Sequence, residues 1–404
     1  MGISRRPTLI ALLAILGCLA GGLPSSSAAP GVNGRRIKIG IHAPVTGAVP
    51  LPSDSVDRAA RLYWRWLRHK DQTINRRNVR VVLRNDQSNP STAVAVCKEL
   101  VEEHNVFLLA GTLQSGLPYQ SHACARYAES VGVPYVALGG QEGIVRSFNR
   151  YFAITATLRK QARLLADLFV ERLRGRRRTN GVVWINDPAF AGAHNAFARA
   201  LERRNADVDY DRTVARNAGT TEARLIVEEM RLAEVDNVFF IHTPIFFLNV
   251  LKQADTQGFE PRWTGVGPGI GGNDEVARTA CGGGATLDGA KFLSALPAFL
   301  DRDRFDRRHD RAMNAIYPQS EGNDTTWLGW ATSKALRKML ERPGRRLTRA
   351  RFARRVERAR IRTGILPTIR FRPRDHFGGR GVHVLTARCK DRRWHTTNAF
   401  VTDF

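Results

Sequence analysis

Small and polar residues cluster where strands are expected to end and helices to begin, and such residues could bind a small solute. The positions concerned are Ser115, Gly116, Gly139, Gly140, Gln141, His242 and Thr243. Backbone N–H groups at a helix start lack intrahelical partners and lie at the positive end of the helix dipole, so they bind small anionic groups. Glycine there lets the backbone approach a ligand closely. Ser115 could instead be a simple helix cap, and a lone histidine such as His242 is more often structural.

Enzyme chemistry finds less support in the sequence. Gly267 to Gly272 formally match the G-x-G-x-x-G pattern of dinucleotide-binding proteins, but Pro268 interrupts the pattern and no helix clearly follows. The chain lacks G-x-S-x-G, H-E-x-x-H and P-loop motifs, and its cysteines show no C-x-x-C spacing. We therefore expect a binding protein rather than an enzyme, with no cofactor and no metal site, and an NAD-dependent oxidoreductase is the weaker alternative.

Strands and helices alternate along most of the chain. Strands are expected at 37–42, 79–84, 106–110 and 134–138, and again at 181–185, 237–241 and 262–265, with helices between them. Helical sequence returns between 302 and 360, and the tail is β-like. This order predicts an α/β protein with two doubly wound parallel-sheet lobes. Such sheets bind ligands at the carboxyl ends of their strands, which selects the loops 44–47, 111–116 and 139–143.

The first 28 residues read as an export signal rather than as part of the fold. Arg5 and Arg6 precede an apolar run from Leu9 to Leu19, and small residues follow. The run is too short for a transmembrane helix, which needs about 20 apolar residues. Cleavage after 28 or 29 would give a free protein. Alternatively the signal ends at 17 and Cys18 is lipidated, because 15–18 resemble a bacterial lipobox.

Cysteine usage fits an exported chain. Without Cys18, the chain has four cysteines, Cys97, Cys124, Cys281 and Cys389, which permit three pairings. We favour Cys97–Cys124 and Cys281–Cys389, while four buried thiols are the alternative. In a sheet of order 2-1-3-4 the second and third helices lie side by side, so Cys97 and Cys124 can pair.

The charge balance is strongly basic. Formal net charge is +26, with the densest runs at 172–178 and 345–362. A nucleic-acid partner is one reading of such charge. In the second run, however, apolar residues recur at helical spacing, so its arginines fill a solvated face, and export separates the chain from nucleic acid. The charge could instead favour anionic ligands or an anionic envelope surface.

Several motifs together resemble a known family. They are 37–41 with 44–47, 84–90, Gly111 with Ser115 and Gly116, 132–136 and 374–379. In this order and spacing they resemble the branched-chain-amino-acid-type periplasmic binding proteins, the solute receptors of ATP-driven importers. The resemblance implies a type I fold with three crossovers and hinge closure around a small polar solute. It implies a linker at 29–35, one lobe of 36–156 with 298–366, and a second of 157–297 with 367–404. The implied partners are membrane permease subunits, and we expect a monomer.

The resemblance also bears on the ligand. Asp187 to Gly192 match a family loop that presents an aromatic ring, which would be Phe190, although a core phenylalanine is an equal alternative. Where family members use acidic residues for an ammonium group, this chain has Arg159 and Pro268. Glu142, Asp187 or Asp274 could substitute; otherwise the ligand is a carboxylate or amide, because burying an unpaired ammonium is unfavourable. A ligand-sensing domain of a signalling system is the alternative role for the same fold.

Overall fold

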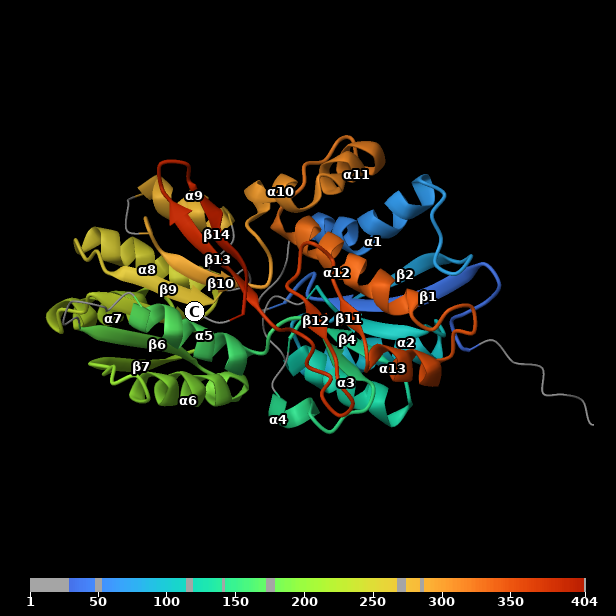
Figure 1. Cartoon of the computed structure of the whole chain (residues 1–404). Coiled ribbons are helices and arrows are strands. Elements are labelled where there is room, and N and C mark those ends of the chain that lie inside the picture. The colour runs from blue at the N-terminus through green and yellow to red at the C-terminus, as the bar shows by residue number, and fades with distance from the viewer. Residues whose placement is uncertain are drawn as a thin grey trace, which may run out of the picture.

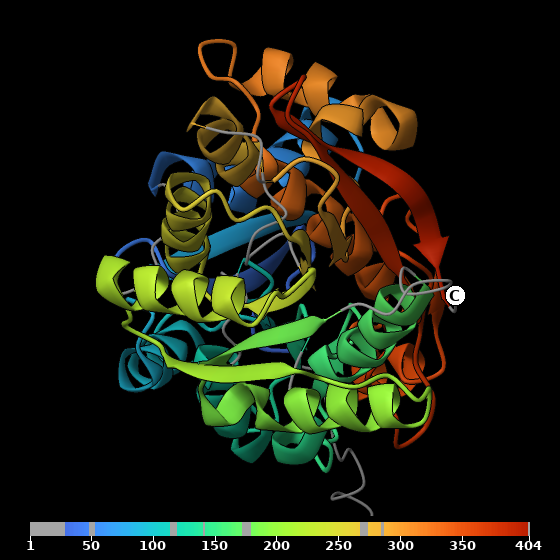
Figure 2. The same cartoon turned by 90° about the vertical axis from the view of Figure 1, so that its left-hand side faces the viewer.

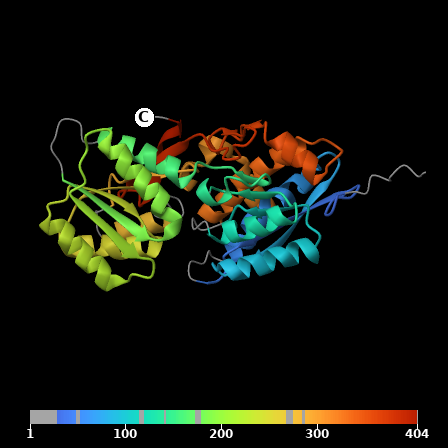
Figure 3. The same ribbon diagram turned by 90° about the horizontal axis from the view of Figure 1, so that it is seen from below.

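The computed structural model describes residues 29–47, 53–113, 119–139, 142–171, 179–266, 274–283 and 287–402. Two α/β lobes lie side by side, as Figures 1 and 3 show. Each lobe is built on its own sheet, and the predicted fold class is confirmed. The predicted signal sequence and Cys18 lie outside the described residues. Among the described helices, none is both long and apolar enough to cross a bilayer.

The first lobe contains a five-stranded parallel sheet in the order β2-β1-β3-β4-β5, which confirms the predicted 2-1-3-4 arrangement. Its strands are β1 (Arg36–Ala43), β2 (Asn78–Asn85), β3 (Leu108–Gly111), β4 (Tyr135–Ala137) and β5 (Tyr151–Ala153). Helices α1 (Ser53–His69), α2 (Pro90–Glu102), α3 (Tyr119–Ser130) and α4 (Glu142–Val145) come from the same stretch. Side chains alternate between the two faces of a strand. Ile37 and Ile39 therefore join the core with α1, whereas Leu109 and Tyr135 join the core with α2 and α3.

The later helical region returns to the first lobe. It comprises η1 (Phe299–Asp301), α10 (Asp303–Asp306), α11 (Arg308–Ile316), α12 (Asp324–Glu341) and α13 (Arg349–Val356). Side chains of α12 and α13 share the core of α1. A short β11 (Arg360–Ile361) and β12 (Ile369–Arg370) pair follows, and Ile369 and Phe371 are buried in that same core. The lobe limits stated above remain a prediction at this end of the chain.

The second lobe contains a seven-stranded mixed sheet in the order β14-β13-β10-β9-β8-β6-β7. Its strands are β6 (Asn180–Asn186), β7 (Tyr210–Ala215), β8 (Asn237–Ile241), β9 (Arg262–Val266), β10 (Lys291–Ser294), β13 (Val382–Arg388) and β14 (Arg393–Val401). Its helices are α5 (Leu158–Glu171), α6 (Pro188–Glu202), α7 (Thr220–Leu232), α8 (Pro244–Thr256) and α9 (Asp274–Gly283). Figure 2 shows this lobe in front. Strands β13 and β14 run antiparallel, so the β-like tail completes this sheet rather than forming a separate unit.

Both favoured disulfides are present. Cys97 on α2 bonds to Cys124 on α3, with 5.9 Å between their Cα atoms. Cys281 on α9 bonds to Cys389 after β13, with 4.9 Å between their Cα atoms. Each bond joins two elements of one lobe, so the disulfides strengthen the lobes individually and leave the connection between them unconstrained.

Crossover segments connect the lobes after β5, after β10 and after β12. The first and third run together, because the Ala153 N–H donates to the His376 carbonyl (3.0 Å) and the Gly378 N–H donates to the Ala153 carbonyl (2.8 Å). Gly379 lies directly against the first crossover: a Cβ at this position would be 1.9 Å from the Thr155 carbonyl carbon. Only glycine allows the two hinge segments to approach so closely.

We expect Gly379→Ala to lower the free energy of unfolding by about 1–3 kcal/mol, since the added methyl must push the crossovers apart. Gly192→Ala is the matched control, because a Cβ there meets nothing within 4 Å. Chemical denaturation of both variants checks this. Equal stability of the two variants would show that the hinge segments are not in close contact.

Candidate functional site

The carboxyl ends of β1 and β2 are held together by one side chain. Asn85 Oδ1 accepts hydrogen bonds from the N–H groups of Val45 (3.0 Å) and Gln87 (3.0 Å), and its Nδ2 donates to Thr46 Oγ1 (2.8 Å). Gly47 has φ 108°, and a Cβ there would lie 1.9 Å from the Gln87 carbonyl oxygen. The predicted loop 44–47 is thereby fixed against the loop after β2.

A buried hydrogen-bond network lies beneath these loops. His42 and Asp86 are both fully buried, with 2.7 Å between Nδ1 and Oδ2, and His42 Nε2 lies 2.6 Å from the Tyr135 hydroxyl. Burial raises the pKa of Tyr135 well above its usual value, so its hydroxyl keeps its proton. The assignment that fits is Nδ1–H donating to Asp86 and the tyrosine hydroxyl donating to Nε2. The network joins the carboxyl ends of β1 and β2 to the start of β4.

The network has no access to solvent and no metal geometry. The sulfurs of Cys97 and Cys124 lie with a His42 ring nitrogen in a group whose atoms are all within 4.8 Å of one another. Both sulfurs belong to a disulfide, however, so they are not thiolates, and thiolate is the form that ligates zinc. We interpret the His42, Asp86 and Tyr135 network as a support that positions the strand ends.

Two helix starts from different lobes meet between the sheets. The N–H of Asp274, the first residue of α9, donates to Oδ2 of Asp324, the first residue of α12 (3.2 Å). Asn323, the N-cap of α12, donates from Nδ2 to Ser55 Oγ on α1 (2.7 Å). The parallel α1 and α12 therefore both begin on the side of the first lobe where β1 ends. This is the side on which doubly wound sheets bind ligands.

The carboxyl groups at this meeting point have an unusual environment. Asp274 Oδ1 accepts a hydrogen bond from the Trp394 N–H (3.2 Å), whereas buried Oδ2 has no hydrogen-bond donor among the described residues. Burial raises the pKa of Asp274. Burial and then the Asp274 charge raise the pKa of Asp324 to about 7. A carboxylate oxygen without a donor can accept a hydrogen bond from a ligand, and a cationic group is the strongest such donor.

Comparison with known proteins places this site in a family. A family model described as periplasmic binding protein matches residues 36–392. The chain belongs to the periplasmic binding protein family. The branched-chain-amino-acid-type resemblance is thereby confirmed, and membership implies a location outside the cytoplasm. Among curated proteins, none matches the chain significantly.

Solved structures share the fold of this periplasmic binding protein. A fatty acid ABC transporter substrate-binding protein from Thermomonospora curvata has a TM-score of 0.74 and 16% identity, covering 93% of this chain and 95% of that one. A possible leucine/isoleucine/valine-binding protein from Rhodopirellula baltica SH 1 gives 0.72 and 15%, covering 90% and 97%. A Rhodopseudomonas palustris BisB5 solute-binding protein in complex with 3,4-dihydroxybenzoic acid gives 0.70 and 15%, covering 87% and 93%.

In the first lobe of this periplasmic binding protein, one predicted ligand residue can be placed. Gly139 follows β4, and a Cβ there would lie 3.1 Å from the Ala156 carbonyl oxygen in the first crossover. Its own carbonyl accepts a hydrogen bond from the Tyr151 hydroxyl (2.9 Å). Ser115, Gly116, Gly140 and Gln141 lie outside the described residues, so their predicted roles stay predictions.

In the second lobe, the predicted ligand residues are mostly buried. Phe190 is 1% exposed and packs in a core cluster with Trp184 and Phe197. His242 is 2% exposed, and burial lowers its pKa to about 4, so the ring is neutral. Its Nδ1 accepts a hydrogen bond from the Thr243 N–H (2.9 Å), and its Nε2–H donates to the Ala215 carbonyl (3.0 Å). Thr243 Oγ1 caps α8. These contacts hold the ends of β7 and β8 together. The predicted ligand-binding roles of His242, Thr243 and Phe190 remain predictions.

Sequence reasoning selected Asp274 only as one of three acidic substitutes, and it missed Asp324, His42, Asp86 and Tyr135. The other two acidic residues that we considered for an ammonium group are Asp187 and Glu142. Asp187 is half-buried and follows β6, and the side chain of Glu142 is not among those that the structure describes. A polar residue at the end of an apolar strand was the available signal for His42 and Asp86. For Asp324 the signal was its place after Asn323, a capping residue, at a helix start.

The raised pKa of Asp324 predicts a pH-dependent stability. A carboxyl group that binds its proton more tightly in the folded protein stabilises the fold when protonated, so stability falls as pH rises from about 4 to about 7. Asp324→Asn keeps an oxygen acceptor and cannot ionise. We expect the thermal unfolding midpoint of Asp324→Asn, minus that of the natural chain, to increase as the pH rises across this range. Thermal unfolding of both proteins in a pH series measures this difference. The exposed Glu321→Gln is the control, and midpoints of Asp324→Asn that run parallel to the natural chain would contradict this account.

Proposed function

We propose that this periplasmic binding protein captures a small solute between its lobes and delivers it to the permease of an ATP-driven importer, without catalysing a reaction. The observation that carries the proposal is the meeting of α9 and α12 at Asp274 and Asp324. A single hydrogen bond joins the two helix starts there, and a buried carboxylate oxygen has no donor among the described residues. A solute that binds both lobes at this place would stabilise the closed arrangement.

The solute that we propose carries a carboxylate, and an amino acid is the first choice among such solutes. The structural relatives named above are named for a fatty acid or for leucine, isoleucine and valine, or are in complex with 3,4-dihydroxybenzoic acid. All of these compounds contain a carboxylic acid group. Helix starts in the predicted ligand loops supply N–H groups for a carboxylate. Asp274 supplies an acceptor for an ammonium group. This chain has Arg159 and Pro268 where family members use acidic residues for that purpose, so another acceptor is needed. An amide or a carboxylate without an amine is the alternative.

The proposal also includes where the receptor works and which membrane proteins it meets. A monomeric receptor outside the cytoplasm would present the closed, loaded form to permease subunits in the membrane. Lipid attachment at Cys18 would keep it near them, and a free secreted form would reach them by diffusion. Neither form needs a nucleic acid partner.

We expect one amino acid to raise thermal stability in a screen of amino acids, amides, benzoates and fatty acids. Solute at about 100 times its dissociation constant adds about 2.7 kcal/mol to the free energy of unfolding. Asp274→Asn should remove most of the shift given by the amino acid and leave the smaller shift of its deaminated analogue unchanged, because only the ammonium group needs the charge.

The control for this experiment is Glu228→Gln, which removes an exposed carboxylate on α7 without a described partner. Full response of Asp274→Asn to the amino acid would remove Asp274 from the site. Absence of any shift with all four solute classes would contradict the proposed receptor function itself.

A further inference from the structure

A pocket lies on the first lobe, at the end remote from the proposed solute site. It has a volume of about 500 Å³, and ten residues line it, namely Arg35, Arg36, Arg61, Trp64, Arg65, Arg68, Asn78, Val79, Arg80 and Val81. Arg36 and Asn78 open β1 and β2, whereas His42 and Asp86 lie where these strands end. The pocket is therefore at the amino ends of the strands and does not belong to the cleft between the lobes.

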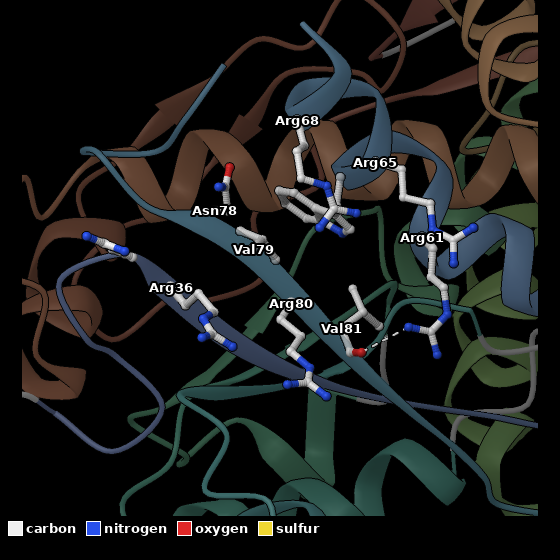
Figure 4. Close-up of a pocket in the computed structure, with 10 residues that line it drawn as sticks. Arg36, Arg61, Arg65, Arg68, Asn78, Val79, Arg80 and Val81 are labelled. Carbon is white, nitrogen blue, oxygen red and sulfur yellow. Dashed lines mark hydrogen bonds between the residues drawn. The ribbon is translucent and has the colours of Figure 1, made fainter. Parts of the chain in front are cut away.

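Helical spacing and strand pairing place the arginines along both sides of the edge strand β2. Arg61, Trp64, Arg65 and Arg68 lie three or four residues apart and share one face of α1. Arg36 pairs with Asn78 in the β1–β2 ladder, and Arg80 follows two residues later on the same edge strand. In Figure 4, Arg61, Arg65 and Arg68 project from the helix on one side of β2, and Arg36 and Arg80 lie on the other.

The positive charge in this pocket is largely uncompensated. Among the six arginines, Arg61 pairs with Asp57 (2.6 Å) and also donates to the Val81 carbonyl (3.1 Å), and Arg65 lies over the Tyr317 ring. The exposed side chains of Arg35, Arg36, Arg68 and Arg80 have neither a carboxylate nor another hydrogen-bond partner among the described residues. None of the ten lining residues is acidic. A carboxylate ligand would neutralise only one of these groups.

The lining also contains a buried aromatic side chain. Trp64 is 5% exposed, and its indole Nε1 has no hydrogen-bond acceptor among the described residues. The aromatic ring adds a flat apolar wall beside the guanidinium groups. The pocket thus combines several arginine guanidinium groups with the amide of Asn78 and the indole ring of Trp64.

We propose that this pocket binds an anion that carries phosphate groups. Guanidinium groups bind phosphate oxygens through two parallel hydrogen bonds, and a multiply charged phosphate ligand matches several unpaired arginines better than a single carboxylate. Such groups reach the pocket either on a soluble oligophosphate or on phospholipid headgroups. In a form lipidated at Cys18, the 16 residues between this cysteine and Arg35 let the chain span at most about 60 Å, so headgroups would be within reach.

A competing explanation for these arginines is that they protect the exposed edge of the sheet from pairing with other chains. β2 is an edge strand, and cationic side chains on an edge discourage pairing with other chains. That role requires charge but neither a pocket nor a ligand, so the two explanations differ in whether phosphate binds specifically. Net charge must be matched in the test, because any strongly basic protein attracts anions.

The test uses the full chain with the substitutions Arg36→Gln, Arg68→Gln and Arg80→Gln. Its matched control carries Arg203→Gln, Arg231→Gln and Arg262→Gln, three exposed arginines of the second lobe, so both variants lose the same charge. One arm measures sodium tripolyphosphate binding by calorimetry at about 0.15 M salt. The other measures cosedimentation with phosphatidylglycerol vesicles against phosphatidylcholine vesicles. Thermal unfolding of both variants verifies that each is folded.

We expect the natural chain and the control to bind in at least one arm, and the pocket variant to bind at least tenfold more weakly in that arm. Binding to tripolyphosphate alone identifies a soluble phosphate ligand, and binding to vesicles alone identifies headgroups. Equal loss in the two variants would show that net charge, not the pocket, attracts the anion. No binding by the natural chain in either arm would also overturn the proposal. Each of these results is independent of solute binding in the cleft.

Discussion

The contact between Asp274 and Asp324 is the interaction on which the proposed receptor function depends. Each carboxyl group sits at a helix start, where the dipole favours negative charge, yet burial opposes ionisation of both, and the Asp274 charge further opposes ionisation of Asp324. One hydrogen bond of 3.2 Å joins the two lobes there. Such a contact is weak enough to open and contains an acceptor that a cationic solute group could use. The proposed receptor function follows from this combination.

Each lobe is fixed internally by buried hydrogen bonds and by a disulfide of its own. Within the first lobe, a fully buried network links His42 and Asp86, at the carboxyl ends of β1 and β2, to Tyr135 at the start of β4. Within the second, His242 joins the ends of β7 and β8. Each disulfide also lies inside one lobe. Stiff bodies joined by close-packed crossovers at Gly379 are suited to hinge motion, because the strand-end loops move with their lobe rather than individually.

Features that depend on local periodicity were predictable from the sequence. Alternating strands and helices gave the two sheets, the order 2-1-3-4 and the feasible Cys97–Cys124 pair, and all three are present. Phe190 shows the limit of this reasoning, since sequence left core and ligand roles equally open, and tertiary packing buries the ring. The contacts of His42 with Tyr135, 93 residues away, and of Asp274 with Asp324 depend on how the chain returns across the lobes. The spacing of the arginines of α1 is visible in the sequence, but their place around the same pocket as Arg36 and Arg80 depends on the strand register.

Small-angle X-ray scattering of the full chain, with and without the solute that gives the largest thermal shift, tests the central claim most directly. Solute binding between two hinged lobes predicts a smaller radius of gyration at saturation, together with fewer long vectors in the pair-distance distribution. Scattering curves that superimpose at saturating solute would contradict capture by closure of the cleft.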